Sequence, residues 1–126
     1  MDVDALRRET LTFIETCRMG EWQWRYSAEA TVPTLYSSCY AAMTRSLYND
    51  LDSLSEAERA AWADHLNAHQ DEDGLYRDPA IFGQGWYAGD PLWCGRAHLT
   101  CHVIIALAAL GSAAPREMAL VAHYRR

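Results

Sequence analysis

Two cysteines and two histidines in the C-terminal third of the chain are the residues best suited to chemistry. Cys94, His98, Cys101 and His102 follow one another at steps of four, three and one. Cys94, His98 and either Cys101 or His102 therefore share one face of a helix. Thiolate and imidazole are ligands that zinc prefers, and an open position on the ion would activate a water or a thiolate. Zinc held by Cys94, His98 and His102 is one interpretation.

The other interpretation of this helix is structural. One helix rarely supplies three ligands to a single ion, so Cys101 would lie in the core while His98 and His102 hydrogen-bond to loop groups or line a cavity. On this interpretation no cofactor is expected. If the chain is an enzyme, Asp90, His98 and His102 are the candidate catalytic residues.

Aromatic residues in or beside the predicted loops form a second group. Rings with polar edges suit glycans or isoprenoid cations, and loops that meet at one end of the helices would line the mouth of a pocket. The alternative is that these rings cover the core. The candidate substrate-binding residues are Trp22, Trp24, Trp86, Tyr87, Trp93 and Arg96.

Helices must position these groups. Apolar residues at steps of three and four predict helices over residues 2–19, 33–51, 55–70 and 92–110, and residues 115–126 begin a fifth. Ser55 and Glu58 have the spacing of a capping box. Residues 21–31 alternate aromatic and polar side chains; we expect an aromatic loop there, with a short strand as the alternative. Residues 71–91 hold four glycines and two prolines and predict a long loop.

The acidic stretch QDEDGLY, residues 70–76, is either a cation-binding loop or a structural turn. A calcium loop needs ligands at alternate positions and a closing glutamate, which does not follow here. Asp73-Gly74 is typical of turns. The turn is the preferred interpretation.

A weak internal repeat supports it. Shifting the sequence by 62 residues places Tyr36 on His98 and Tyr40 on His102, as in stacked helix pairs. The QDEDGLY stretch resembles the Q-x-x-x-G-x-W motif of squalene and terpene cyclases and the Q-x-x-D-G-x-F turn of protein prenyltransferase β subunits. The resemblance spans residues 33–111.

This resemblance implies an α/α toroid, with inner and outer helices around an apolar cavity. Gln70 would cap backbone groups and tie neighbouring repeats together, Asp73 and Gly74 would form the turn, and Tyr76 would pack beneath it. The acid motif D-x-D-D of class II cyclases is absent. We expect an all-α fold of antiparallel helix pairs, a partial toroid of about five helices, in one domain over residues 1–126 that is complete or a segment of a larger toroid.

Composition and charge argue against several classes of function. The net charge of −6 and the lack of a basic cluster argue against nucleic-acid binding. The apolar stretch 99–111 is shorter than a bilayer of about 30 Å requires, and the acidic N-terminus is unlike a secretory signal. We expect a cytoplasmic protein without a membrane span.

Two functional hypotheses remain. The preferred one is a non-catalytic helical module that assembles with itself or with a partner protein through an open apolar helix face. The alternative is a terpene cyclase-like or prenyltransferase-like enzyme or enzyme segment, which binds an elongated isoprenoid or glycan and is assisted by zinc.

Overall fold

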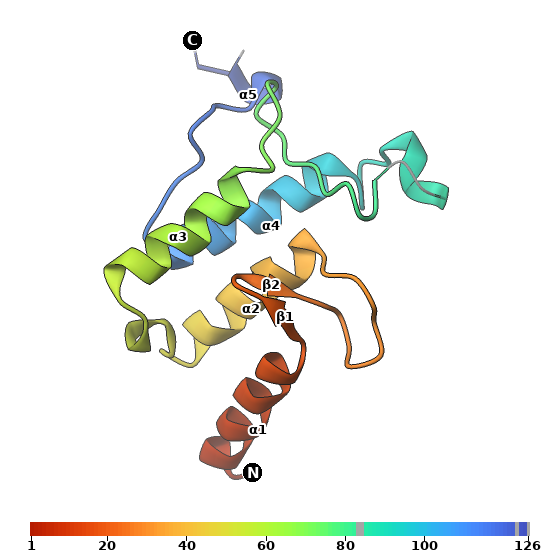
Figure 1. The fold of residues 1–126 in the computed structure, drawn as a ribbon. Coiled ribbons are helices and arrows are strands. Elements are labelled where there is room, and N and C mark those ends of the chain that lie inside the picture. Colours follow the sequence, from red (N-terminus) through yellow and green to blue (C-terminus); the bar gives the residue numbers. More distant parts are fainter. Residues whose placement is uncertain (83–84, 123, 126) are drawn as a thin grey trace.

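The computed structural model describes residues 1–82, 85–122 and 124–125. This part of the chain is mostly helical, with five α-helices and one two-stranded hairpin (Figure 1). The helices are α1 (Val3–Thr16), α2 (Leu35–Leu47), α3 (Glu56–Asn67), α4 (Arg96–Ala109) and α5 (Ala119–Ala122). Two short 3-10 helices, η1 (Leu51–Ser53) and η2 (Gly85–Gly89), lie in the connections. The expectation of a mainly helical chain is confirmed, while the helices described here do not close into a ring.

Helices α2, α3 and α4 form the centre of the molecule. Figure 1 shows that α2 and α4 run in the same direction, whereas α3 runs the opposite way. Their facing sides supply the core, where several side chains are fully shielded from solvent: Trp62, Leu66, Leu99, Val103 and Leu107. Among the described residues, no helix combines the length and the apolar character needed to cross a membrane.

Side-chain caps explain where α2 and α3 begin. The Thr34 hydroxyl accepts a hydrogen bond from the Ser37 backbone N–H at 3.1 Å, so α2 begins at Leu35 rather than at residue 33. The predicted capping box of α3 is confirmed, since Ser55 and Glu58 exchange hydrogen bonds of 3.1 and 2.7 Å.

The prediction that residues 21–31 form a loop without a strand needs correction. Strand β1 (Arg18–Gly20) pairs antiparallel with β2 (Gln23–Trp24). Trp22 makes the tight turn with a positive φ of 62°, and its carbonyl accepts a hydrogen bond from the Ser38 hydroxyl at 2.8 Å. Strand β2 is too short for an alternating pattern of side chains to be recognised in the sequence. Its partner β1 lies before residues 21–31, in a stretch that includes the end of the predicted first helix.

Helix α1 is only loosely covered. None of its residues is buried, and Val3, Leu6 and Phe13 are exposed. Its apolar stripe nevertheless faces the rest of the molecule in part, because Phe13 and Ile14 line a groove between α1 and α2.

Candidate functional site

Two tyrosines of α2 and two histidines of α4 form one cluster. The Tyr36 hydroxyl lies 2.8 Å from Nδ1 of His98. The rings of Tyr40 and His102 meet edge to face at 5.4 Å, and the two histidine rings are 4.5 Å apart. The sequence interpretation placed the histidines in a candidate site, but it did not include the tyrosines that hold them.

This cluster lies on the side of α2 that α3 does not cover. On α2, Ser38 faces α3, since its hydroxyl accepts a hydrogen bond from the Trp62 indole at 2.9 Å. Tyr36 precedes Ser38 by two residues, which is roughly 200° around a helix. Tyr40 shares the face of Tyr36 and keeps 41% of its surface exposed. The cluster is therefore open to solvent on one side.

The tyrosines of the cluster are proton donors rather than bases. Burial raises the pKa of Tyr36 and also that of Tyr40, and neighbouring phenol and thiol groups add to both effects. Both hydroxyls therefore stay protonated at neutral pH. Tyr36 also approaches the Cys94 carbonyl at 3.3 Å, so its hydroxyl is shared between the start of α4 and His98. The pair can orient an imidazole and donate a hydrogen bond.

The zinc interpretation gains no support from the geometry. Among the described residues, no group of three or more His, Cys, Asp and Glu side chains is placed to hold a metal ion. Nδ1 of His102 lies 2.9 Å from the His98 carbonyl, one turn back on α4. Burial, together with nearby Asp90, raises the pKa of the Cys94 thiol, which keeps it in the weakly ligating protonated form. Cys101 is exposed rather than buried.

Asp90 and Arg96 make contacts that organise the start of α4. The Asp90 carboxylate accepts a hydrogen bond from the Arg96 backbone N–H at 2.7 Å, and so caps the helix. The Arg96 guanidinium is bound by Asp71 at 2.8 Å and by Asp73 at 2.6 Å. Both candidate site residues are thus engaged in positioning the helix that carries the two histidines.

The QDEDGLY stretch forms a turn, which we call the Gln70 turn (residues 70–76). Nε2 of Gln70 donates to the Gly74 carbonyl at 3.0 Å and to the Arg116 carbonyl at 2.8 Å, while Oε1 accepts from the Arg116 N–H at 3.0 Å. The side chain therefore joins the turn to the segment that follows α4. In Figure 1 this segment runs back along α4 toward the turn.

Gly74 and Tyr76 allow the Gln70 turn to pack closely against neighbouring segments. Gly74 has a φ of +82°, and a Cβ there would collide with the Glu117 carbonyl, so glycine is required on both grounds. Tyr76 is fully buried; its N–H donates to the Thr100 hydroxyl at 2.9 Å and its hydroxyl donates to Asn67 at 2.7 Å. The turn thus contacts α3, α4 and the C-terminal segment together.

The Asp73–Arg96 ion pair predicts a specific response to acid. The hydrogen bond from Arg96 holds the pKa of Asp73 below its ordinary value. A lowered pKa contributes stability that is present above the unfolded-state value of about 4 and is lost as the pH falls through the folded value. Asp73→Asn should therefore be less stable than wild type at neutral pH, and the difference should shrink below about pH 4. Urea unfolding at a series of pH values measures this.

Asp64→Asn is the matched control, because it makes the same change at an exposed aspartate on α3. Its unfolding free energies should follow those of wild type at every pH. A constant gap between wild type and Asp73→Asn down to the acid limit would contradict the assigned role of the Asp73–Arg96 pair.

The predicted aromatic pocket residues are spread over different environments. Trp22 and Trp24 are buried and stack on Trp62, with ring centroids 5.2 and 4.6 Å apart. Tyr87 is half-buried and meets Phe82 edge to face at 5.7 Å. Trp93 is 69% exposed. The side chain of Trp86 lies outside the described part of the chain. The described rings therefore do not gather into the single pocket mouth that we considered.

No protein-family model, curated protein or solved structure matches this chain. Its function is therefore inferred from the contacts of its own residues.

Proposed function

We propose that this chain is a non-catalytic helical-repeat module of the α/α-toroid type, which self-associates through an open apolar face of α4. One observation carries the repeat assignment. Tyr36 and His98 are 62 positions apart and hydrogen-bond to each other, and Tyr40 and His102, which have the same separation, are in ring contact. Equivalent positions lie side by side when repeats stack in parallel.

The arrangement of the three central helices supports the same proposal. In an α/α repeat, inner helices run in parallel and each is backed by an outer helix of opposite direction; α2 and α4 have the first relation, and α3 has the second. Gln70, which follows α3, hydrogen-bonds to Arg116 in the segment after α4. The resemblance to the cyclases implies this role for Gln70, which is to connect neighbouring repeats.

The open face of α4 is the proposed contact surface. We define it by four exposed residues: Cys101, Ile104, Ile105 and Ala108. Ile104 and Ile105 keep 38% and 52% of their surfaces exposed. Full burial of an exposed isoleucine contributes about 1.5–3 kcal/mol, so covering the exposed part of each side chain contributes roughly half of that. From residue 97 to residue 109 the helix holds no Asp, Glu, Lys or Arg.

A second copy of the chain is the occupant that this surface fits. A net charge of −6 opposes self-association where charges meet, but α4 itself brings no charged side chain to the contact between residues 97 and 109. Two-fold dimers are also the commonest symmetric assemblies. We therefore expect an isologous dimer in which α4 packs on α4 of the second copy.

Native mass spectrometry and sedimentation over a concentration series test this proposal. Wild type should form dimers, and Ile105→Glu should weaken dimerisation at least about tenfold, because it removes apolar contact and buries a charge at the interface. Leu92→Glu is the matched control, because Leu92 is 81% exposed and lies outside the open face. A wild type that stays monomeric, or an Ile105→Glu variant that dimerises like wild type, would overturn self-association.

The Tyr36–His98 pair favours a second candidate function. A protonated phenol next to an imidazole on the open side of two inner helices would suit an enzyme of the toroid type acting on a substrate held between them. The mass spectra separate the two candidates, since a retained small molecule on a monomer would favour the enzyme.

A further inference from the structure

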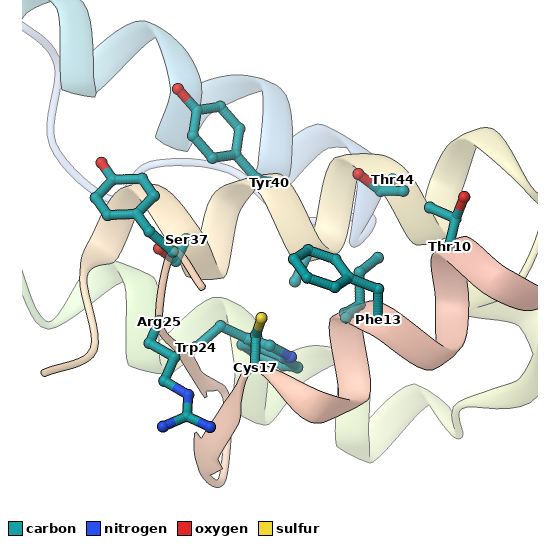
Figure 2. Close-up of a pocket in the computed structure, with 11 residues that line it drawn as sticks. Thr10, Phe13, Cys17, Trp24, Arg25, Ser37, Tyr40 and Thr44 are labelled. Carbon is teal, nitrogen blue, oxygen red and sulfur yellow. The ribbon is translucent and has the colours of Figure 1, made fainter. Parts of the chain in front are cut away.

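A groove between α1 and α2 lies apart from the Gln70 turn and from the open face of α4. Its walls come from α1, from the hairpin and the residues after it, and from α2 (Figure 2). The cavity volume is about 310 Å³, at the low end of the roughly 300–1,000 Å³ of small-molecule sites. Most of the lining is apolar or aromatic: Phe13, Ile14, Cys17, Trp24, Tyr40 and Ala41.

The floor of this groove holds a hydrogen-bond donor without an acceptor. Trp24 is 1% exposed, and its Nε1 is buried with no hydrogen-bond partner among the described residues. Figure 2 shows the Trp24 ring beneath Phe13, close to Cys17. A buried donor that stays unpaired is costly, by about 1–3 kcal/mol, and most such donors in proteins have a partner. The Trp62 indole in the same stack has such a partner, because it donates to the Ser38 hydroxyl.

The groove also carries a positive charge, that of Arg25. Arg25 is the one charged residue among the described residues that line it. Its guanidinium donates to the carbonyls of Ala30 and Thr16, each at 3.2 Å. None of the ion pairs found among the described residues includes Arg25.

Neutral hydroxyls complete the polar part of the lining. Burial raises the pKa of Tyr26 to about 12, so this phenol does not oppose an anion at neutral pH. Ser37 and Thr44 add two further hydroxyls from α2. An anion in the groove would therefore meet one positive charge, several hydroxyl groups and no negative charge from the described lining.

We propose that this groove binds a small amphipathic carboxylate. The apolar body packs between Phe13 of α1 and Tyr40 and Ala41 of α2. The carboxylate accepts the hydrogen bond that Trp24 Nε1 does not donate within the protein. Arg25 sits at the edge of the groove in Figure 2, with its guanidinium directed away from Tyr40, so it favours the anion through its field rather than by contact.

Three probes with ten-carbon chains and different head groups test the assignment: decanoate, decanol and decyltrimethylammonium. Calorimetric titration, below the concentrations at which these compounds form micelles, should show saturable binding of decanoate. Decanol should bind at least about tenfold more weakly, because a hydrogen bond to a charged acceptor is the stronger one. The cationic probe should not bind, because Arg25 repels it. In a proton–nitrogen NMR spectrum, decanoate should shift the indole resonance of Trp24.

Two variants assign the contacts. Trp24→Phe keeps a ring in the stack but removes the N–H, and should weaken decanoate binding about tenfold. Trp22→Phe is the matched control: Trp22 is buried and stacks on the same Trp62, but it does not line the groove, so it should leave decanoate affinity unchanged. Arg25→Gln should weaken decanoate about fivefold and leave decanol unaffected.

Several outcomes would overturn the proposal. They are the absence of saturable decanoate binding, equal affinity for decanol, or tighter binding of the cation. If Trp24→Phe does not fold, the wild-type indole resonance decides: a Trp24 signal that stays in place while decanoate binds excludes this groove. Equal losses from Trp24→Phe and Trp22→Phe would likewise assign the effect to a damaged stack rather than to a lost hydrogen bond.

Discussion

Trp62→Ala should lower the free energy of unfolding by about 3–5 kcal/mol, the range for removing a buried tryptophan. Trp62 is fully buried, stacks on both hairpin tryptophans, and donates to the Ser38 hydroxyl at 2.9 Å. The substitution therefore opens a cavity where α2, α3 and the hairpin meet. Urea denaturation followed by circular dichroism measures the loss, which is a large part of the stability of a typical domain.

Two further variants separate the causes of that loss. Trp62→Phe keeps an aromatic ring in the stack and loses the hydrogen bond to Ser38, so it should cost less than Trp62→Ala. Trp93→Ala removes the same atoms from a residue that is 69% exposed, and should cost under about 1 kcal/mol. If Trp62→Ala and Trp93→Ala cost the same, the stack does not hold the hairpin on the helices.

Gln70→Leu should lower the free energy of unfolding by about 2–3 kcal/mol, at about 1 kcal/mol for each of three hydrogen bonds. Leucine keeps the bulk of the buried side chain but leaves the Gly74 carbonyl and the Arg116 backbone without these partners. Amide hydrogen exchange should also become faster at Arg116, because its N–H loses its acceptor. Denaturation and exchange on the same samples measure both effects.

Gln23→Leu is the matched control for this change. Gln23 lies in β2 and is exposed, so the substitution should shift stability by no more than about 0.5 kcal/mol and leave exchange at Arg116 unaltered. Unchanged exchange at Arg116 in Gln70→Leu would show that other contacts hold the C-terminal segment to the turn.

Local rules predicted most of the helical structure. The Ser55–Glu58 box marked the start of α3, because a cap depends only on residues three apart. Helix ends differed from the prediction by a few residues where a capping side chain decides them, as Thr34 does for α2. The hairpin was missed because it depends on contacts distant in sequence, namely the stacking on Trp62 and the bond from Ser38 to the Trp22 carbonyl.

The candidate sites likewise combine features that the sequence predicted with contacts that it could not show. The repeat spacing already paired Tyr36 with His98 and Tyr40 with His102, and this signal could have identified the whole cluster. The sequence could not show that Arg96 is held by Asp71 and Asp73, because these residues come from a distant turn. Nor could it place Phe13 opposite Tyr40, since helical periodicity says which face is apolar but not what lies across from it.

The contacts of the Gln70 turn also bear on the order in which the chain folds. Gln70 and Arg116 are 46 positions apart, whereas Ser55 and Glu58 are three apart. Closing a longer loop costs more chain entropy before its contacts contribute, so helices and hairpin can form before the C-terminal segment is captured. Interactions that form after the folding barrier slow unfolding more than they speed folding. We therefore expect substitutions in the Gln70 turn to raise the unfolding rate more than they lower the folding rate.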